Sequence, residues 1–495
     1  MNPISHGADW DFDLLERYDA AIAKVAAEYG LDTYPNQIEI ITSEQMIDAY
    51  ASNGLPVGYP HWSYGKEFIR NEQAYKRGMQ GLAYEIVINS NPCIAYLMEE
   101  NTMATQALVI AHASYGHNSF FKGNHLFRQW TAADGILDYL VFARRYVMEC
   151  EERHGAAAVE EVLDACHALM AHGVDRYRRP AAPTLKAETA RLAEREAHRE
   201  RQFNDLWRTL PAKTAKPVAG AAKSFPGEPQ ENILFFVETF SPKLEPWERE
   251  LVRIVRTLAQ YFHPQGQTKV MNEGWATFWH YTILNRLHEQ GQVDDGFMLE
   301  FLTSHTNVVY QPAFDSDYYR GINPYALGFA MFSDLRRICE RPTPEDRTWF
   351  PDLAGSDWRL ALDFAMRNFK DESFVAQYLS PRLIRQLHLF AIADHAAEST
   401  FEVDSIHDER GYRRVRTLLA RQHAQENRVP DVQVAGFDRD GDRSLTLRHI
   451  RRRGRPLDDA AATVVAHLRR LWGFPVRLET WENDSRVHAV AEVAA

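Results

Sequence analysis

Cysteine is scarce in this chain. Its 495 residues include four cysteines, at positions 93, 150, 166 and 339, and no two of them form a Cys-x-x-Cys pair. Small secreted domains depend on dense disulfides, whereas cysteines in a reducing compartment are few and free. The sequence therefore argues against a disulfide framework, and we expect a cytoplasmic protein.

Long apolar runs are also absent. No stretch approaches eighteen uninterrupted apolar residues, and the segment from Met1 to Trp10 is polar and acidic. A membrane-spanning helix needs such a run, and a secretory signal needs a basic start followed by an apolar segment. We therefore expect neither a membrane span nor a secretory signal.

Positive charge is in deficit, because the formal net charge is −12. A dedicated nucleic-acid binder would carry a basic surface, so this class is not expected despite a local Arg-rich patch at 448–455. The sequence also lacks a P-loop, a dinucleotide fingerprint and a Gly-x-Ser-x-Gly elbow. What it does contain is 45% hydrophobic and 12% aromatic residues, which is ample for a large core.

Hydrophobic periodicity predicts a mainly α protein with minor β structure, of the α+β class. Strands are expected at 37–41, 84–88 and 93–98. The run from His263 to Gly266 is expected to form a turn between helices. Helices are expected at 10–29, 102–116, 136–179, 185–210, 246–262, 269–287, 297–309, 323–339, 358–368 and 381–394.

Composition divides the chain into a large and a small part. A main domain is expected in two halves, 1–210 and 230–425, joined by a linker at 211–229 that is rich in Ala, Lys, Gly and Pro. A small α+β domain is expected at 429–495, with strands at 431–437, 444–450 and 476–481 and a helix at 458–471. Between its first two strands, 438–442 fits a hairpin turn and not an EF-hand loop, because Gly is fourth and His449 twelfth.

A carboxylate and an imidazole lie seven residues apart in an apolar, helix-compatible run. Glu273 and His280 are separated by two helical turns, so they share one face. Buried Glu and His side chains are costly unless they are paired, hydrogen-bonded or bound to a metal. The run therefore predicts either half of a divalent-metal site or a bridging contact inside a helical core.

A second cluster lies far upstream, where His112 and His117 are five residues apart in another apolar run. Five residues rotate by about 500° on a regular helix, so the two side chains would be roughly 140° out of line. For both histidines to bind one ion, the helix must contain a bulge or end at Gly116.

Several separated strings of the chain are characteristic, at 34–39, 112–123, 246–267, 272–281, 323–325 and 407–412. With these strings the chain resembles the stage V sporulation protein R family over essentially its whole length. The resemblance implies a cytoplasmic bacterial protein associated with spore cortex formation in sporulating organisms. In other bacteria it implies a role in stress responses, with a serine protein kinase and a von Willebrand-type protein as the expected partners.

The strings at 97–101, 110–117 and 272–276 also resemble, in order, the zincin metallopeptidases whose third ligand is a glutamate. This resemblance implies that His112, His117 and Glu273 bind zinc. In those peptidases the general base follows the first histidine, where this chain has Ala113. A base must then come from elsewhere, and Glu100 is the favoured candidate, with Glu99 as the alternative because strand alternation turns only one of the two toward the site.

Further polar and aromatic residues are candidates for the same site. His280 is a candidate metal ligand, as are His61 and His125. His305 and Tyr325 are candidate catalytic residues, in a region where transition-state donors are expected. A structural role is the alternative for both His305 and Tyr325. His305 would then be a core histidine bonded to the backbone, and Tyr325 would be a packing residue.

Two hypotheses of function remain from the sequence. The first is a zincin-like, metal-dependent hydrolase that acts on peptide or amide bonds and binds a divalent metal, zinc by preference. The second is a non-catalytic adaptor whose buried polar cluster is structural and whose acidic surface and Arg-rich C-terminal domain bind partner proteins. Stoichiometric metal in the purified protein would separate the two.

Overall fold

The computed structural model divides the chain into two compact units, 1–163 with 257–429, and 164–256 with 430–495. It describes residues 3–51, 58–59, 61–62, 66, 69, 85–178, 225–226, 228–393, 402–405, 408–424, 429–451, 456–482 and 485–493. Tyr84, the expected helix at 185–210 and the 211–224 part of the expected linker lie outside the described residues.

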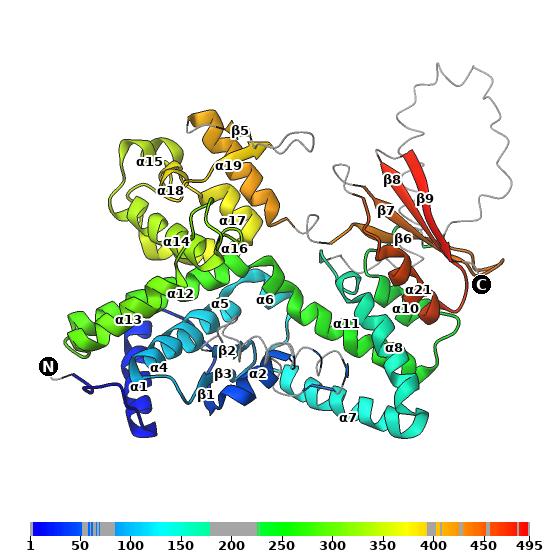
Figure 1. Ribbon diagram of the computed structural model, residues 1–495, viewed down its shortest axis with the longest axis horizontal. Coiled ribbons are helices and arrows are strands. Elements are labelled where there is room, and N and C mark those ends of the chain that lie inside the picture. Colours follow the sequence, from blue (N-terminus) through cyan, green and yellow to red (C-terminus); the bar gives the residue numbers. More distant parts are fainter. Residues whose placement is uncertain are drawn as a thin grey trace, which may run out of the picture. The chain divides into compact units, whose positions relative to one another are not determined.

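The first unit is mainly helical, which confirms the predicted fold class (Figure 1). Among the described residues, no helix is both long and apolar enough to cross a membrane. The helices of this unit are α1 (Phe12–Glu28), α2 (Ser43–Ala51), α4 (Met103–Ile110), η1 (Ala111–His117), α5 (Asn118–Gly123), α6 (His125–Trp130), α7 (Ile136–His154), α12 (Lys269–Glu289), α13 (Asp295–Val308), α14 (Pro324–Glu340), α15 (Pro344–Trp349), α16 (Trp358–Asn368), α17 (Asp371–Tyr378), α18 (Pro381–Gln386) and α19 (Glu409–Gln422).

A small sheet lies against these helices in the order β1-β3-β2, with β1 at Asn36–Ile41, β2 at Glu85–Ile88 and β3 at Cys93–Met98. Strand β3 pairs in parallel with β1 and antiparallel with β2. Its side chains are buried on both faces apart from Tyr96, as the continuous apolar sequence of β3 predicts. Among the described residues, this unit also contains a two-stranded pair, β4 (Ala391–Ala393) and β5 (Glu402–Ser405).

Helix α12 runs through the hydrophobic core of the first unit. Its apolar and aromatic side chains, among them Trp275, Phe278 and Trp279, are buried around most of its circumference. A helix that is apolar all round must be covered on every side, which explains why it packs against α1, η1, α13 and α14. Polar side chains on α12, such as those of Asn272 and His280, are therefore held inside the core.

Two close backbone approaches fix α12 beside its neighbours. A Cβ atom on Gly116 of η1 would lie 2.6 Å from the Cα of Ala276, and one on Gly274 would lie 2.3 Å from the Cα of Gly328 in α14. Only glycine allows helices to come this close. These contacts place η1 and α14 against the part of α12 that carries Glu273.

The second unit contains a four-stranded sheet in the order β6-β7-β8-β9, formed by β6 (Val432–Phe437), β7 (Leu445–Ile450), β8 (Val476–Glu482) and β9 (Ser485–Val493). Helix α21 (Ala461–Trp472) connects the parallel strands β7 and β8. The antiparallel pairing of β6 and β7 confirms the hairpin expected at 438–442. The unit also contains η2 (Met170–His172) and α10 (Ile233–Phe240), while α8 (Ala156–Ala168) and α11 (Pro246–Gln267) each span a unit boundary.

The units divide the chain differently from the expected domains, because 430–495 groups with 164–256. Aromatic packing explains this grouping. Phe236 of α10 stacks on Trp472 of α21, and Phe225 contacts both Phe236 and Phe437. Gln230 also forms an isolated β-bridge with Val434. The C-terminal sheet thus shares its core with residues upstream of α11.

Three expected boundaries were wrong. The helix expected at 136–179 is divided at Gly155, which has φ 87°. The helix expected at 381–394 ends at Gln386, because His388 adopts a left-handed φ of 51° and 391–393 forms β4. The turn expected at 263–266 is instead the last turn of α11, where Pro264 removes only one helical hydrogen bond.

Candidate metal centre

The two histidines of the upstream cluster lie on a π-helical segment. Residues Ala111–His117 form η1, between the α-helices α4 and α5. A π-helix closes its hydrogen bonds between residues five apart, so it aligns side chains at that spacing. His112 and His117 are thereby brought to one side, with ring centroids 4.6 Å apart. The helix contains the irregularity that their spacing required.

Two carboxylates face these imidazoles. The Oε1 atom of Glu85 lies 3.1 Å from Nε2 of His112 and 3.7 Å from Nε2 of His117. The Oε2 atom of Glu273 lies 3.4 Å from Nε2 of His117 and 3.8 Å from Nε2 of His112. Ligand atoms of Glu85, His112 and His117 lie within 4.8 Å of one another, and Oε2 of Glu273 approaches the same two imidazoles.

Glu273 is positioned by the start of α12. The carboxylate of Asp371, which is fully buried, accepts hydrogen bonds from the backbone N–H groups of Val270 and Met271, each at 2.9 Å. A carboxylate here satisfies N–H groups that the first helical turn leaves free and complements the helix dipole. The first turn of α12, and with it Glu273, is thereby fixed.

Each imidazole is also held from behind, through its Nδ1 atom. Nδ1 of His117 lies 2.9 Å from Oδ1 of Asn272, and Nδ1 of His112 lies 2.9 Å from Nδ1 of His280. The other ring nitrogen of His280, Nε2, lies 2.8 Å from Nδ1 of His305. Both ring nitrogens of His280 are therefore in contact with other imidazoles. In this structure His280 supports the potential metal ligand His112 and is not itself a potential metal ligand.

Burial and charge shift the protonation of these groups. Burial raises the pKa of Glu85. Burial also disfavours the charged form of His117, but Glu273, Glu85 and Asn272 outweigh it and raise the pKa of His117 to about 9. For Glu273, burial is outweighed by His117 and His112, which hold its pKa below the usual value. Burial and the neighbouring histidines lower the pKa of His280, and burial lowers that of His305 to about 4.

The donor set fits a divalent ion. Two atoms bound to one tetrahedral zinc ion at about 2.0–2.1 Å lie about 3.3 Å apart, close to the distances in this cluster. The Oε1 atom of Glu85 faces the imidazoles, but its Oε2 atom is buried without a hydrogen-bond partner, a cost that a bound cation would offset. Two ionised glutamates would neutralise the charge of the ion. By its chemistry, the site suits zinc or a similar first-row metal.

The other predicted site residues lie in different places. Glu99 and Glu100 are exposed in the turn after β3. The ring of Tyr325 stacks on that of His112, with centroids 6.2 Å apart, so Tyr325 borders the cluster. His125 bonds the carbonyl of Arg367 through Nδ1, and the ring of His61 lies beside Trp62.

Sequence reasoning missed Glu85. Its run, Glu85-Ile86-Val87-Ile88, was predicted only as a strand, and the structure confirms the strand. The available clue was an acidic residue at the start of a short apolar strand. Which side of β2 would face the histidines depends on the antiparallel register of β2 with β3, in which Glu85 pairs with Leu97.

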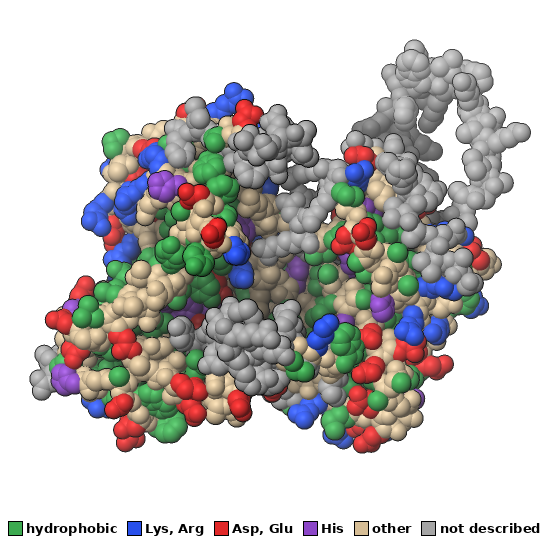
Figure 2. All heavy atoms as spheres, viewed as in Figure 1, with side chains coloured by type: hydrophobic (Ala, Val, Ile, Leu, Met, Phe, Trp, Pro, Cys, Tyr) green, Lys and Arg blue, Asp and Glu red, His purple; other side chains and the backbone are tan. Residues whose placement is uncertain are grey.

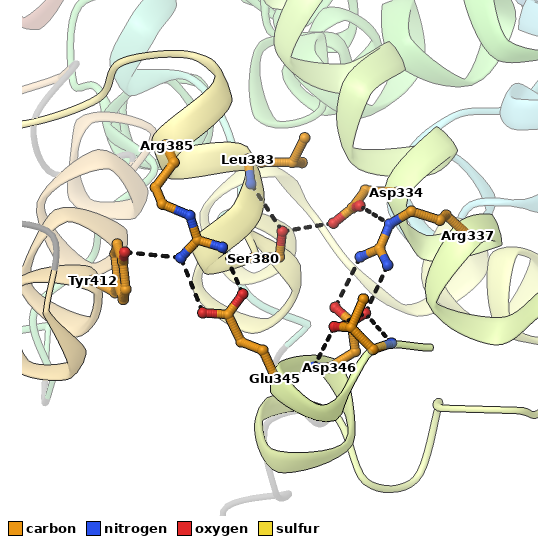
Figure 3. Close-up of polar contacts among 9 residues, drawn as sticks. Asp334, Arg337, Glu345, Asp346, Ser380, Leu383, Arg385 and Tyr412 are labelled. Atoms are coloured by element: carbon orange, nitrogen blue, oxygen red, sulfur yellow. Dashed lines mark hydrogen bonds and ion pairs between the residues drawn. The ribbon is translucent and has the colours of Figure 1, made fainter. Parts of the chain in front are cut away.

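A second buried polar cluster in the same unit provides a contrast (Figure 3). Arg337 donates to Asp334 at 2.7 Å and to both carboxylate oxygens of Asp346 at 2.6 and 2.8 Å. Asp334 also accepts from the hydroxyl of Ser380 at 2.6 Å, and Asp346 accepts from the backbone N–H and the hydroxyl of Thr343. Every charge in this cluster has an opposite charge bonded to it.

Fold and site together define a mainly helical protein with a buried centre of two histidines and two glutamates. A family model described as SpoVR like protein matches residues 9–428, and one described as SpoVR-like C-terminal domain matches residues 430–483. The chain belongs to the SpoVR family, as its sequence strings indicated. It is 58% identical over 484 residues to "Uncharacterized protein YcgB" of Escherichia coli (strain K12), a match that covers 98% of this chain and 95% of that relative. No solved structure matches the chain.

Proposed function

We propose that this protein is a zinc-dependent hydrolase of the zincin-like type, acting on peptide or amide bonds. In this proposal His112, His117 and Glu273 hold the ion. The observation that carries the proposal is that the Nε2 atoms of His112 and His117 each lie 3.1–3.8 Å from one carboxylate oxygen of Glu85 and one of Glu273. Two His and one Glu are the ligand set of several zinc peptidases.

The hydrogen bonds behind the imidazoles favour a metal over a simple cluster of ion pairs. A histidine that binds zinc through Nε2 carries its proton on Nδ1 and donates it to a fixed acceptor. Both His112 and His117 have such a partner on Nδ1, at 2.9 Å, and both turn Nε2 toward the carboxylates.

We assign the role of general base to Glu85, in place of Glu99 or Glu100. Its Oε1 atom lies near both imidazoles, while its buried Oε2 atom has no partner and can take up a proton. Burial raises the pKa of Glu85, which brings a carboxylate closer to the range useful for proton transfer near neutral pH. In this proposal Glu85 supplies the general-base carboxylate that the zincin metallopeptidases carry after their first histidine, where this chain has Ala113.

A zinc ion bound here supplies Lewis acidity that polarises water or a carbonyl group. The chain's own residues do the rest. Glu85 accepts a proton at Oε2, Asn272 holds the ring of His117, and Tyr325, whose ring lies against that of His112, is a candidate for contact with substrate.

Paired variants test the assignment. Glu273→Gln should lose bound zinc. Glu85→Gln should keep zinc, measured by elemental analysis, and lose cleavage of a fluorescence-quenched peptide library and of cell-wall peptide fragments. Glu100→Gln and Glu99→Gln are matched controls, because both side chains are exposed, and should change neither quantity. Full cleavage by Glu85→Gln would contradict the role of Glu85 as base.

A closed zinc centre in a non-catalytic adaptor is the second candidate. Glu85 lies as near to the imidazoles as Glu273 does, and four protein donors would leave no position for water. In that case Glu85→Gln would weaken zinc binding as Glu273→Gln does, and no variant would affect cleavage because the wild type has none.

We place this function in the cytoplasm, as the family resemblance and four buried free cysteines suggest. The family also points to a serine protein kinase and a von Willebrand-type protein as partners in stress responses. Co-purification of both proteins with the zinc-loaded chain, and not with Glu273→Gln, would support this setting.

A further inference from the structure

Three buried imidazoles form a continuous chain that leads away from the proposed zinc site. The atoms His112 Nδ1 and His280 Nδ1 are 2.9 Å apart, and His280 Nε2 and His305 Nδ1 are 2.8 Å apart. The exposed fractions of the three residues are 3%, 0% and 5%. The residues come from η1, α12 and α13, so the chain links three helices.

We propose that His280 and His305 are positioning residues that lock His112 into one tautomer and one orientation when zinc is bound. This inference rests on the proposed zinc centre. Neither His280 nor His305 binds the ion. Zinc bound to His112 determines which ring donates and which ring accepts in each hydrogen bond.

The direction follows from counting protons on neutral rings. Zinc takes the lone pair of His112 Nε2, so the single proton of that ring is on Nδ1 and is donated to His280 Nδ1. The proton of His280 is then on Nε2 and is donated to His305 Nδ1. The proton of His305 must therefore be on Nε2. One tautomer of each ring thus satisfies both hydrogen bonds that link the three imidazoles.

Packing keeps the far end of the chain in place. The ring of His305 is surrounded by Tyr281 and Phe329, each with centroids 4.8 Å away, and by Phe301 at 5.9 Å. Aromatic rings on several sides prevent His305 from rotating its Nδ1 away from His280. The acceptor at the end of the chain is thus fixed before zinc binds.

The two histidines proposed to bind zinc differ in how many residues support them through hydrogen bonds. His117 donates to Asn272, a side chain that belongs to the same helix as Glu273, and its support ends there. His112 is supported through two further rings, each of which polarises the next. Loss of the distant acceptor on His305 should therefore reach the zinc site through His112 and leave the contact between His117 and Asn272 intact.

Substitution of His305 separates a hydrogen-bonding role from a packing role. His305→Leu removes the acceptor and should weaken zinc binding about tenfold, measured by competition with a chromophoric chelator. His305→Asn offers an acceptor oxygen near the position of Nδ1 and should restore most of the affinity. Phe301→Leu, a packing change beside the same ring, should lower the melting temperature and leave the zinc affinity within about twofold of the wild type.

Equal zinc affinities in His305→Leu and His305→Asn would overturn the proposal. So would a loss of affinity in Phe301→Leu as large as that in His305→Leu, because the effect would then come from packing alone.

The tautomers themselves give a direct readout. Long-range nitrogen–proton spectra of the zinc-loaded protein, with ¹⁵N-labelled histidine and resonances assigned through single substitutions, should show His280 and His305 as neutral rings protonated on Nε2. Protonation of either ring on Nδ1 in the zinc-loaded protein would contradict the inference while leaving the zinc centre itself intact. A wild-type protein that binds no zinc would instead refute the proposed function.

Discussion

The Arg337 cluster and the His112–His117 cluster are both buried, charged and built between helices of the same unit, but they differ in how completely they are satisfied. Around Arg337, two aspartates, a serine and a threonine leave the cation and both anions bonded. Around the histidines, one carboxylate oxygen of Glu85 has no partner. A buried carboxylate oxygen without a partner is costly, and this cost supports our proposal that the second cluster binds a further cation.

The two clusters differ in their bonding, and this difference separates a self-contained polar cluster from the proposed metal centre. A structural cluster ends on its own members, as the bidentate contact of Arg337 with Asp346 does (Figure 3). A metal centre turns its donor atoms toward one point and places its hydrogen bonds behind them. The surface face in Figure 2 mixes acidic and basic side chains, and exposed ion pairs such as that of Arg145 with Glu149 carry no such information.

The largest expected effect is the loss of metal on removal of one ligand. His117→Ala should reduce zinc from about one equivalent to near zero, because only His112 and Glu273, two of the three proposed protein ligands, would remain. Elemental analysis of the purified variants measures this. Arg337→Ala should keep the full equivalent, and a loss of zinc there would show that the two clusters are not independent.

The next effect is on stability. Arg337→Ala should lower the free energy of unfolding by about 3–5 kcal/mol, because it leaves Asp334 and Asp346 buried without a counter-charge. Urea denaturation gives this value. Arg145→Ala, which removes an exposed ion pair with Glu149 on α7, is the control and should cost at most about 1 kcal/mol. Equal costs would mean that the Arg337 network contributes no more than a surface pair.

A smaller effect is expected from the contact that joins η1 to α12. Gly116→Ala forces a Cβ against the backbone of Ala276, so the helices must separate, at a cost of about 1–3 kcal/mol in stability and with weaker zinc binding. In the control Gly266→Ala, near the end of α11, nothing lies within 4 Å of the new Cβ, and stability should be unchanged or slightly higher. Unaltered zinc affinity in Gly116→Ala would show that the close contact between Gly116 and Ala276 does not position His117.

The remaining expected effects appear only away from neutral pH, as changes in the pH dependence of unfolding at opposite ends of the scale. The folded pKa of His117, about 9 without metal, lies above its unfolded value, so its stabilisation is complete below about pH 6.5 and is lost as the pH rises through about 9. Burial opposes ionisation of Asp346, but hydrogen bonds from Arg337 and Thr343 lower its pKa to about 2, so its stabilisation is lost as the pH falls through about 2.

Urea titrations of chelator-treated protein between pH 2 and pH 10 measure both the alkaline and the acidic loss of stability. His117→Ala should remove the alkaline loss and keep the acidic one. An alkaline loss that persists in His117→Ala would assign it to another group.

Much of the fold could be predicted from the sequence, since periodicity gave β1, β3, α12, α13 and the β6–β7 hairpin. The pairing of Glu273 with His112 and His117 was also expected. The spacing of the two histidines required a bulge or a helix end at Gly116 but could not choose between them, and no local pattern marked the left-handed His388. The grouping of 430–495 with upstream aromatic residues was hidden because it depends on contacts between distant segments. Glu85 was missed for the same reason, since strand register decides which side chain meets the histidines.

X-ray absorption at the zinc edge, on wild-type protein purified without added metal, tests the central claim most directly. The account predicts a zinc signal whose first shell contains only nitrogen and oxygen, at about 2.0–2.1 Å, with the multiple scattering of two imidazole rings. A sulfur shell near about 2.3 Å, or no zinc or other first-row metal in the protein, would contradict it.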